Sequence, residues 1–130
     1  SYNKVTGLVK PRTGEEIYKA LFGNTKTDCV KILNYQDQVV PKIDYAIWLH
    51  FETCPSELNR ILSLHEYKSK KVSTKGWITD GPSVNEKWFK PKNLGDSIIV
   101  FEFKKDEYGN WQWIYSSMDS GRVFVEDVAD

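Results

Sequence analysis

Three consecutive segments near the C-terminus have strand character, and they restrict the possible folds more than any other feature of the sequence. The first, 97–104, begins with apolar residues on both faces, which is typical of a strand with neighbours on both sides. A glycine-containing loop at 106–110 leads into 111–117, and a turn at 118–121 leads into 122–128. Because such short connections join antiparallel neighbours, the sequence predicts a three-stranded antiparallel meander.

The clearest strand in the first half of the chain is 45–52, and it runs directly into a helix. Its odd positions form a wholly apolar face, whereas its even positions are mixed. Pro55 suits the first turn of a helix, and Glu57 lies where a carboxylate faces the positive end of the helix dipole. The helical stripe continues through Leu58, Ile61, Leu62 and His65.

The N-terminal part supplies another helix and another strand. Thr13 and Glu16 have the spacing of a capping box, and apolar residues follow them at helical intervals. This pattern predicts a helix over 14–22, a strand over 28–35 and a polar turn over 36–42. Together with the meander, these elements predict an α+β fold, an antiparallel sheet of about five strands with two short helices packed on it.

The segment 66–96 shows neither helical nor strand periodicity, and glycine and proline residues punctuate it. Connections longer than about 12–15 residues are uncommon in compact domains and are usually functional or disordered. This one carries large apolar side chains, so we expect an ordered loop packed on the sheet. We divide the 130 residues into a polar leader or tether at 1–12 and a single domain at 13–130.

The composition excludes several classes of protein. Aromatic residues make up 14% of the chain, which is too many for a disordered segment. Lysine plus arginine and aspartate plus glutamate both total 18, so the net charge is zero and no overall field attracts nucleic acid. No apolar run approaches the ~20 residues of a membrane-spanning helix. We expect a monomer with no nucleic-acid partner and no transmembrane segment.

The two cysteines, Cys29 and Cys54, leave two states open. A disulfide between them would stabilise the fold by about 3 kcal/mol and would fit an exported protein. Two free thiols, one in a strand and one at the start of a helix, are the alternative. The sequence has no CxxC motif and no Cys/His cluster, so we expect no zinc site, and we assign no other metal or cofactor.

Only two histidines are available for acid–base chemistry. His50 and Glu52 share one face of a strand, where they could act together. They could equally be two polar residues on a half-exposed sheet face, and this is the interpretation we favour. His65 closes the second predicted helix, where an imidazolium interacts favourably with the carbonyl end of the dipole. We therefore assign no catalytic residue.

Aromatic residues offer the best candidates for a binding site. Exposed aromatic rings at this density suit a glycan or a protein ligand. If the same rings are buried, they form the core of a small sheet instead. On the first interpretation the binding residues lie in the long loop and in the second strand of the meander, and they are Trp77, Trp88, Phe89, Trp111 and Trp113.

We interpret two charged stretches as structural features and not as binding sites. A basic stretch beside Trp77 could bind phosphates and stack a base, but we expect a solvated face, formed by Lys68, Lys70, Lys71 and Lys75. The last strand and the tail are acidic. We expect an edge strand whose charge opposes aggregation, and we do not expect a calcium site. The acidic residues are Asp119, Glu126, Asp127 and Asp130.

The chain contains the motifs IWLHFETCPSEL at 47–58, WFKP at 88–91 and LGDS at 94–97. In these motifs it resembles small uncharacterised bacterial proteins of the envelope-associated lipoprotein type. The resemblance implies a leader and a lipid-bearing cysteine ahead of a small α+β domain, so that Ser1 would follow one of them. It implies the periplasm or cell envelope as the compartment, and it carries over no catalytic residue.

The leading hypothesis is a non-enzymatic bacterial domain, exported or tethered to the envelope. It would bind a protein or glycan partner through its aromatic-rich loop and sheet. One alternative is an intracellular immunity or inhibitor protein, which a compact, neutral chain would suit. A second is a small hydrolase that uses His50 with an acid from the long loop.

Overall fold

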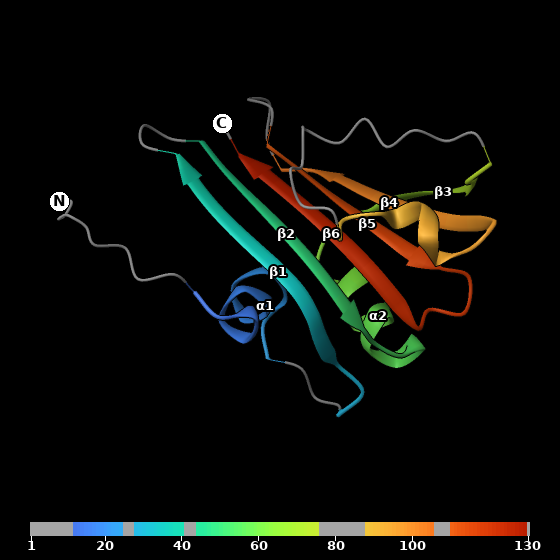
Figure 1. Cartoon of the computed structure of the whole chain (residues 1–130), viewed down its shortest axis with the longest axis horizontal. Coiled ribbons are helices and arrows are strands. Elements are labelled where there is room, and N and C mark those ends of the chain that lie inside the picture. The colour runs from blue at the N-terminus through green and yellow to red at the C-terminus, as the bar shows by residue number, and fades with distance from the viewer. Residues whose placement is uncertain (1–11, 25–27, 41–43, 76–87, 106–109, 130) are drawn as a thin grey trace, which may run out of the picture.

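Figure 1 shows the computed structural model, which describes residues 12–24, 28–40, 44–75, 88–105 and 110–129. All strands in these ranges belong to one six-stranded antiparallel sheet with the order β1-β2-β6-β5-β4-β3. The predicted α+β class is therefore confirmed. In chain order the elements are α1 (Gly14–Phe22), β1 (Lys31–Val40), β2 (Asp44–Glu52), α2 (Pro55–Leu62), β3 (Lys68–Ser73), the 3-10 helix η1 (Pro91–Leu94), β4 (Ser97–Lys104), β5 (Trp111–Ser117) and β6 (Arg122–Ala129).

The C-terminal strand β6 lies inside the sheet, between β2 and β5 (Figure 1). The predicted β4-β5-β6 meander is confirmed, and β4 has neighbours on both sides as expected. The prediction that the acidic last strand forms a sheet edge is wrong. Glu126 and Asp127 are buried on β6, and side-chain hydrogen bonds make their burial tolerable. Asp119 lies in the preceding turn, and Asp130 lies outside the described residues.

Both faces of the sheet are covered, although by different elements. On the first, which we call the helix face, α1 and α2 pack against β2, β5 and β6 in a cluster that includes Ile17, Phe22, Leu49, Phe51 and Ile61. On the second, which we call the aromatic face, the cluster contains Trp48, Phe89, Tyr115 and Phe124. β2 thus buries side chains on both faces, as its apolar odd positions and its mixed even positions allow.

Both helices begin where the sequence predicts. Thr13 accepts a hydrogen bond from the Glu16 backbone N–H, and the Glu16 carboxylate accepts one from Thr13, which completes the capping box of α1. α2 starts at Pro55 but ends at Leu62, so the prediction that His65 closes it is wrong. His65 instead stacks on Phe103, with 4.2 Å between the ring centroids.

Two predicted non-strand segments prove to be partly strands. β1 continues to Val40, so the prediction of a polar turn is wrong over 36–40. β3 occupies the start of the segment that was predicted to be a loop, so the loop prediction is wrong over 68–73. Most of β3 is exposed and gives no apolar period to recognise, and its backbone ladder with β4 holds it in place. Its lysines are solvated as expected, and they lie at a sheet edge, where they oppose aggregation.

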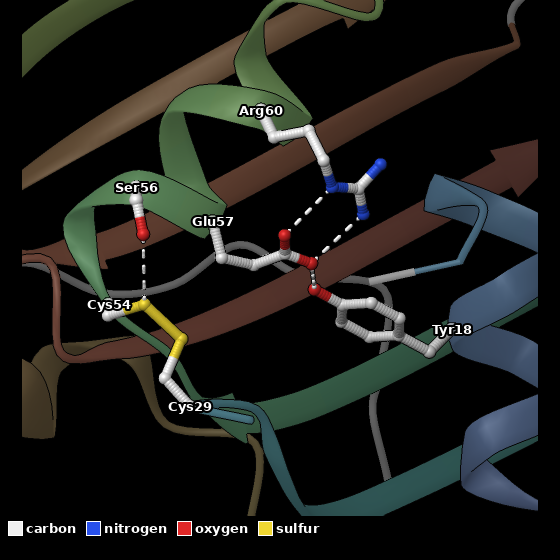
Figure 2. The surroundings of a disulfide bond; sticks show 6 residues. All are labelled: Tyr18, Cys29, Cys54, Ser56, Glu57 and Arg60. Carbon is white, nitrogen blue, oxygen red and sulfur yellow. Dashed lines mark hydrogen bonds and ion pairs between the residues drawn. A yellow bond between two sulfur atoms is a disulfide. The ribbon is translucent and has the colours of Figure 1, made fainter. Parts of the chain in front are cut away.

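Cys29 and Cys54 form a disulfide (Figure 2). Their Cα atoms are 5.9 Å apart, which lies within the usual range. The bond joins the segment that precedes β1 to the N-cap residue of α2. Of the two states that the sequence left open, the structure shows the oxidised one, which indicates an oxidising, extracytoplasmic environment.

Candidate functional site

A row of alternating tryptophan and glutamate side chains crosses the aromatic face. The strand registers place Trp48 opposite Glu126, Glu126 opposite Trp113, and Trp113 opposite Glu102. Residues directly opposite each other on neighbouring strands point to the same side of a sheet. The Trp48 indole N–H donates to Glu126 at 3.2 Å, and the Trp113 indole N–H donates to Glu102 at 3.1 Å. The row therefore consists of two indole–carboxylate pairs.

Burial differs between the two pairs. Trp48 and Glu126 are buried, and loss of hydration raises the pKa of the Glu126 carboxyl above its ordinary value. Trp113 and Glu102 are half-buried and reach the surface. The first pair therefore belongs to the core, whereas the second can meet a ligand.

The exposed end of the row continues onto neighbouring residues of β4 and β5. Trp111 stacks on Trp113, with their ring centroids 5.7 Å apart and their planes 3° from parallel. The Lys104 ammonium lies over the Trp111 ring, 5.9 Å from its centroid. We call this set, Glu102, Lys104, Trp111 and Trp113, the aromatic strip. It combines two indole rings with one carboxylate and one ammonium group.

The structure describes four of the five predicted binding residues, and they differ in burial and in neighbours. Trp111 and Trp113 are together in the aromatic strip. Phe89 is buried in the core of the aromatic face, and Trp88 and Trp113 are both half-buried with one side packed against the same core. Trp77 lies outside the described residues. The structure thus brings the two strand residues together and buries Phe89.

His50 is a buried residue with both ring nitrogens in use. The ring is 7% exposed and stacks on Phe124, with centroids 4.0 Å apart. Its Nε2 atom accepts hydrogen bonds from Arg122 at 3.1 Å, so Nδ1 carries the proton and donates to Asn34 at 2.8 Å. Glu52, the partner considered from the sequence, is exposed, and the ring nitrogens bond to Asn34 and Arg122 instead.

Burial holds His50 in its neutral form. Loss of hydration, followed by the positive charge of Arg122, lowers the pKa of His50 from 6.5 to about 4. An unfolded chain takes up a proton on this residue as the pH falls below 6.5, whereas the folded chain does not. The stability that depends on neutral His50 is therefore present above pH 6.5 and is lost as the pH falls toward 4.

Acidification is expected to destabilise the protein through this residue. Between pH 6.5 and pH 4 the free energy of unfolding should fall by about 2–3 kcal/mol because of His50. Urea titrations of the wild type and of His50→Gln over this range measure the effect, and the variant should show a flatter pH dependence. His65→Gln is the matched control, because His65 is exposed. An equal slope in His50→Gln and in the wild type would contradict the assignment.

Two buried carboxylates on the helix face were not recognised from the sequence. Asp127 accepts a hydrogen bond from Gln112 and forms an ion pair with Lys105, and Gln112 in turn accepts one from Tyr67. Glu57 is fully buried on α2 and binds Tyr18 and Arg60 (Figure 2). Glu57 and Arg60 have the i,i+3 spacing of neighbours on one helix face, but the other partners are distant in the sequence, so the pattern does not reveal that these acids are buried. Both networks are satisfied internally, so neither presents a free acid or base to a ligand.

The described residues contain no group of three or more potential metal ligands. No helix in the described ranges is long and apolar enough to cross a membrane. Comparisons with protein-family models, with curated proteins and with solved structures found no match.

Proposed function

We propose that this domain is a non-enzymatic, exported or envelope-tethered module that binds a glycan on the aromatic strip. The observation that supports the proposal is the pairing of Trp111 and Trp113 with adjacent charged groups at the surface. Indole rings have an apolar body for the C–H faces of a sugar. Glu102 and Lys104 supply an acceptor and a donor for hydroxyl groups. The disulfide and the lipoprotein-like motifs both favour an extracytoplasmic location.

The shape of the strip favours a glycan over a protein. A protein interface of standard size covers about 800 Å² on each partner and has an apolar centre. The indole rings of the strip are only half-exposed. The large apolar side chains that are exposed within the described ranges lie elsewhere, at Tyr35, Leu64 and Met118. The strip therefore suits a narrow ligand with many hydroxyl groups.

A non-enzymatic role is supported by the state of the ionisable groups. His50 has both nitrogens engaged, and its neutral form is protected by burial. The two cysteines are joined in a disulfide, so neither supplies a thiolate nucleophile for hydrolysis. The hydrolase alternative consequently has less support than the binding module. No described feature favours the immunity or inhibitor alternative.

Loss of one indole ring is expected to weaken glycan binding about tenfold, or ~1.4 kcal/mol. An array of bacterial and plant oligosaccharides first identifies the strongest binder, and calorimetry with that oligosaccharide then compares the wild type with Trp111→Ala. Tyr35→Ala is the control, because this exposed aromatic residue lies on β1. The proposal fails if no oligosaccharide binds, or if Tyr35→Ala weakens binding as much as Trp111→Ala does.

A further inference from the structure

A cavity of about 370 Å³ lies beside the disulfide, at the end of the sheet where β5 turns into β6. Cys29 lines this cavity, and Cys54 is not among its described lining residues. Thr53, which precedes Cys54, also lines it. The Thr53 hydroxyl oxygen is buried and has no hydrogen-bond partner among the described residues. Buried polar atoms are nearly always paired with protein or with ordered water, so a polar group held beside Thr53 would give this hydroxyl a partner.

The charges around the cavity indicate what kind of ligand it would hold. Arg122 supplies a cation, and its guanidinium donates to the neutral ring of His50. Glu52 and Asp119 supply carboxylates on the same lining. A molecule with both a carboxylate and an ammonium group would satisfy both signs of charge. A small zwitterionic molecule therefore fits the cavity better than a simple anion or cation.

The position of Cys54 makes it the better leaving group of the two cysteines. Cys54 is the N-cap residue of α2, and no side chain there accepts a hydrogen bond from the first turn. The positive end of the helix dipole stabilises a thiolate at this position. The Ser56 hydroxyl lies 3.4 Å from the Cys54 sulfur and can donate to a thiolate (Figure 2). Glu57 follows in the same turn, but its charge is balanced by Arg60.

We propose that Cys29–Cys54 is a thiol–disulfide exchange site for a small zwitterionic peptide thiol, which attacks the Cys29 sulfur from this cavity. The attacking thiolate forms a bond to Cys29, the bond between Cys29 and Cys54 breaks, and the electron pair leaves on Cys54. A second thiol then attacks the external sulfur of the mixed disulfide and releases Cys29. The products are two protein thiols and one external disulfide, so two electrons pass from the two external thiols to the protein disulfide.

Trapping of the mixed disulfide tests which sulfur is attacked. The oxidised protein is mixed with reduced glutathione, a zwitterionic peptide thiol, and acid-quenched samples are analysed by peptide mass spectrometry. The glutathione adduct should be at least tenfold more abundant on Cys29 than on Cys54. Equal adducts, or more adduct on Cys54, would overturn the proposal.

The kinetics of reduction test the leaving group. Ser56→Ala should slow reduction about threefold, because the Cys54 thiolate loses a donor. Ser63→Ala is the matched control at the other end of the same helix, where the Ser63 hydroxyl donates to the Arg60 carbonyl. This control should leave the rate unchanged. An equal effect of the two substitutions would refute the assigned role of Cys54.

The dependence of the reduction rate on glutathione and on urea separates exchange in the folded protein from exchange after unfolding. The rate should rise linearly with glutathione concentration and should not respond to low concentrations of urea. A rate that saturates at the rate of global unfolding would overturn the proposal.

The substitution Arg122→Gln tests the recognition of a zwitterion. In this variant the ratio of the glutathione rate to the 2-mercaptoethanol rate should fall several-fold. Because any loss of stability affects both thiols, an unchanged ratio would refute the recognition of a zwitterion.

Discussion

The substitution Arg60→Met is expected to lower the free energy of unfolding by about 3–5 kcal/mol at neutral pH. Both carboxylate oxygens of Glu57 accept hydrogen bonds from Arg60, at 2.8 and 2.9 Å. Tyr18 donates to the same carboxylate at 2.5 Å (Figure 2). Because Glu57 is 0% exposed, loss of the guanidinium leaves a buried charge without its counter-ion. Methionine keeps much of the aliphatic stem, so lost packing contributes little.

A second substitution distinguishes lost charge pairing from general disruption. The double variant Glu57→Gln/Arg60→Met should be more stable than Arg60→Met alone, because it removes the unpaired charge. Arg12→Met is a matched control at the more exposed ion pair with Asp37, and it should cost below about 1 kcal/mol. Chemical denaturation measures all of these variants. If Arg60→Met and Arg12→Met cost the same, the Glu57 network does not contribute as described.

Removal of the disulfide has the second largest expected effect. The double variant Cys29→Ser/Cys54→Ser should lose about 3.5 kcal/mol of stability, because the unfolded chain gains the freedom of a loop of 25 residues. For a domain of this size, such a loss corresponds to a decrease in Tm of about 10 °C. Differential scanning calorimetry with and without a reductant measures it.

The reductant supplies the control for this prediction. Reduction of the wild type should lower its Tm to near that of the double variant, and reductant should leave the variant unchanged. A reductant-sensitive Tm in the variant would show that the shift has another origin. A wild type whose Tm is insensitive to reduction would contradict the stabilising role of the bond.

Local patterns predict much of this fold, because its best-formed elements have clear signals. The capping box at Thr13 and Glu16 marks the start of α1. The alternation over 45–52, followed by Pro55, identifies the passage from β2 to α2. The meander follows from three strand-like segments with short turns between them.

The remaining elements depend on contacts that no local pattern records. β3 is exposed and rich in lysine, and it is a strand because its backbone pairs with β4. β6 carries buried acids because Trp48 and Gln112, from other strands, donate hydrogen bonds to them. Each of these partnerships joins residues distant in the sequence, so strand order and acid burial could not be predicted.

The candidate site was predictable only in part for the same reason. The spacing of Trp111 and Trp113 places both on one face of a strand, and the structure confirms that they stack. Whether a ring is exposed depends on what packs over it. Phe89 proves to be core, whereas the strip reaches the surface. The role of Glu102 depends on the register between β4 and β5, which the sequence does not reveal.

The central claim is that the aromatic strip, and not the buried polar groups, meets the ligand. Proton–nitrogen NMR spectra of the indole N–H groups, recorded during titration with the strongest oligosaccharide from the array, test it most directly. The resonances of Trp111 and Trp113 should shift on binding. That of Trp48, whose buried indole donates to Glu126, should stay in place. Shifts centred on Trp48, or no shift at Trp111 and Trp113, would contradict the claim.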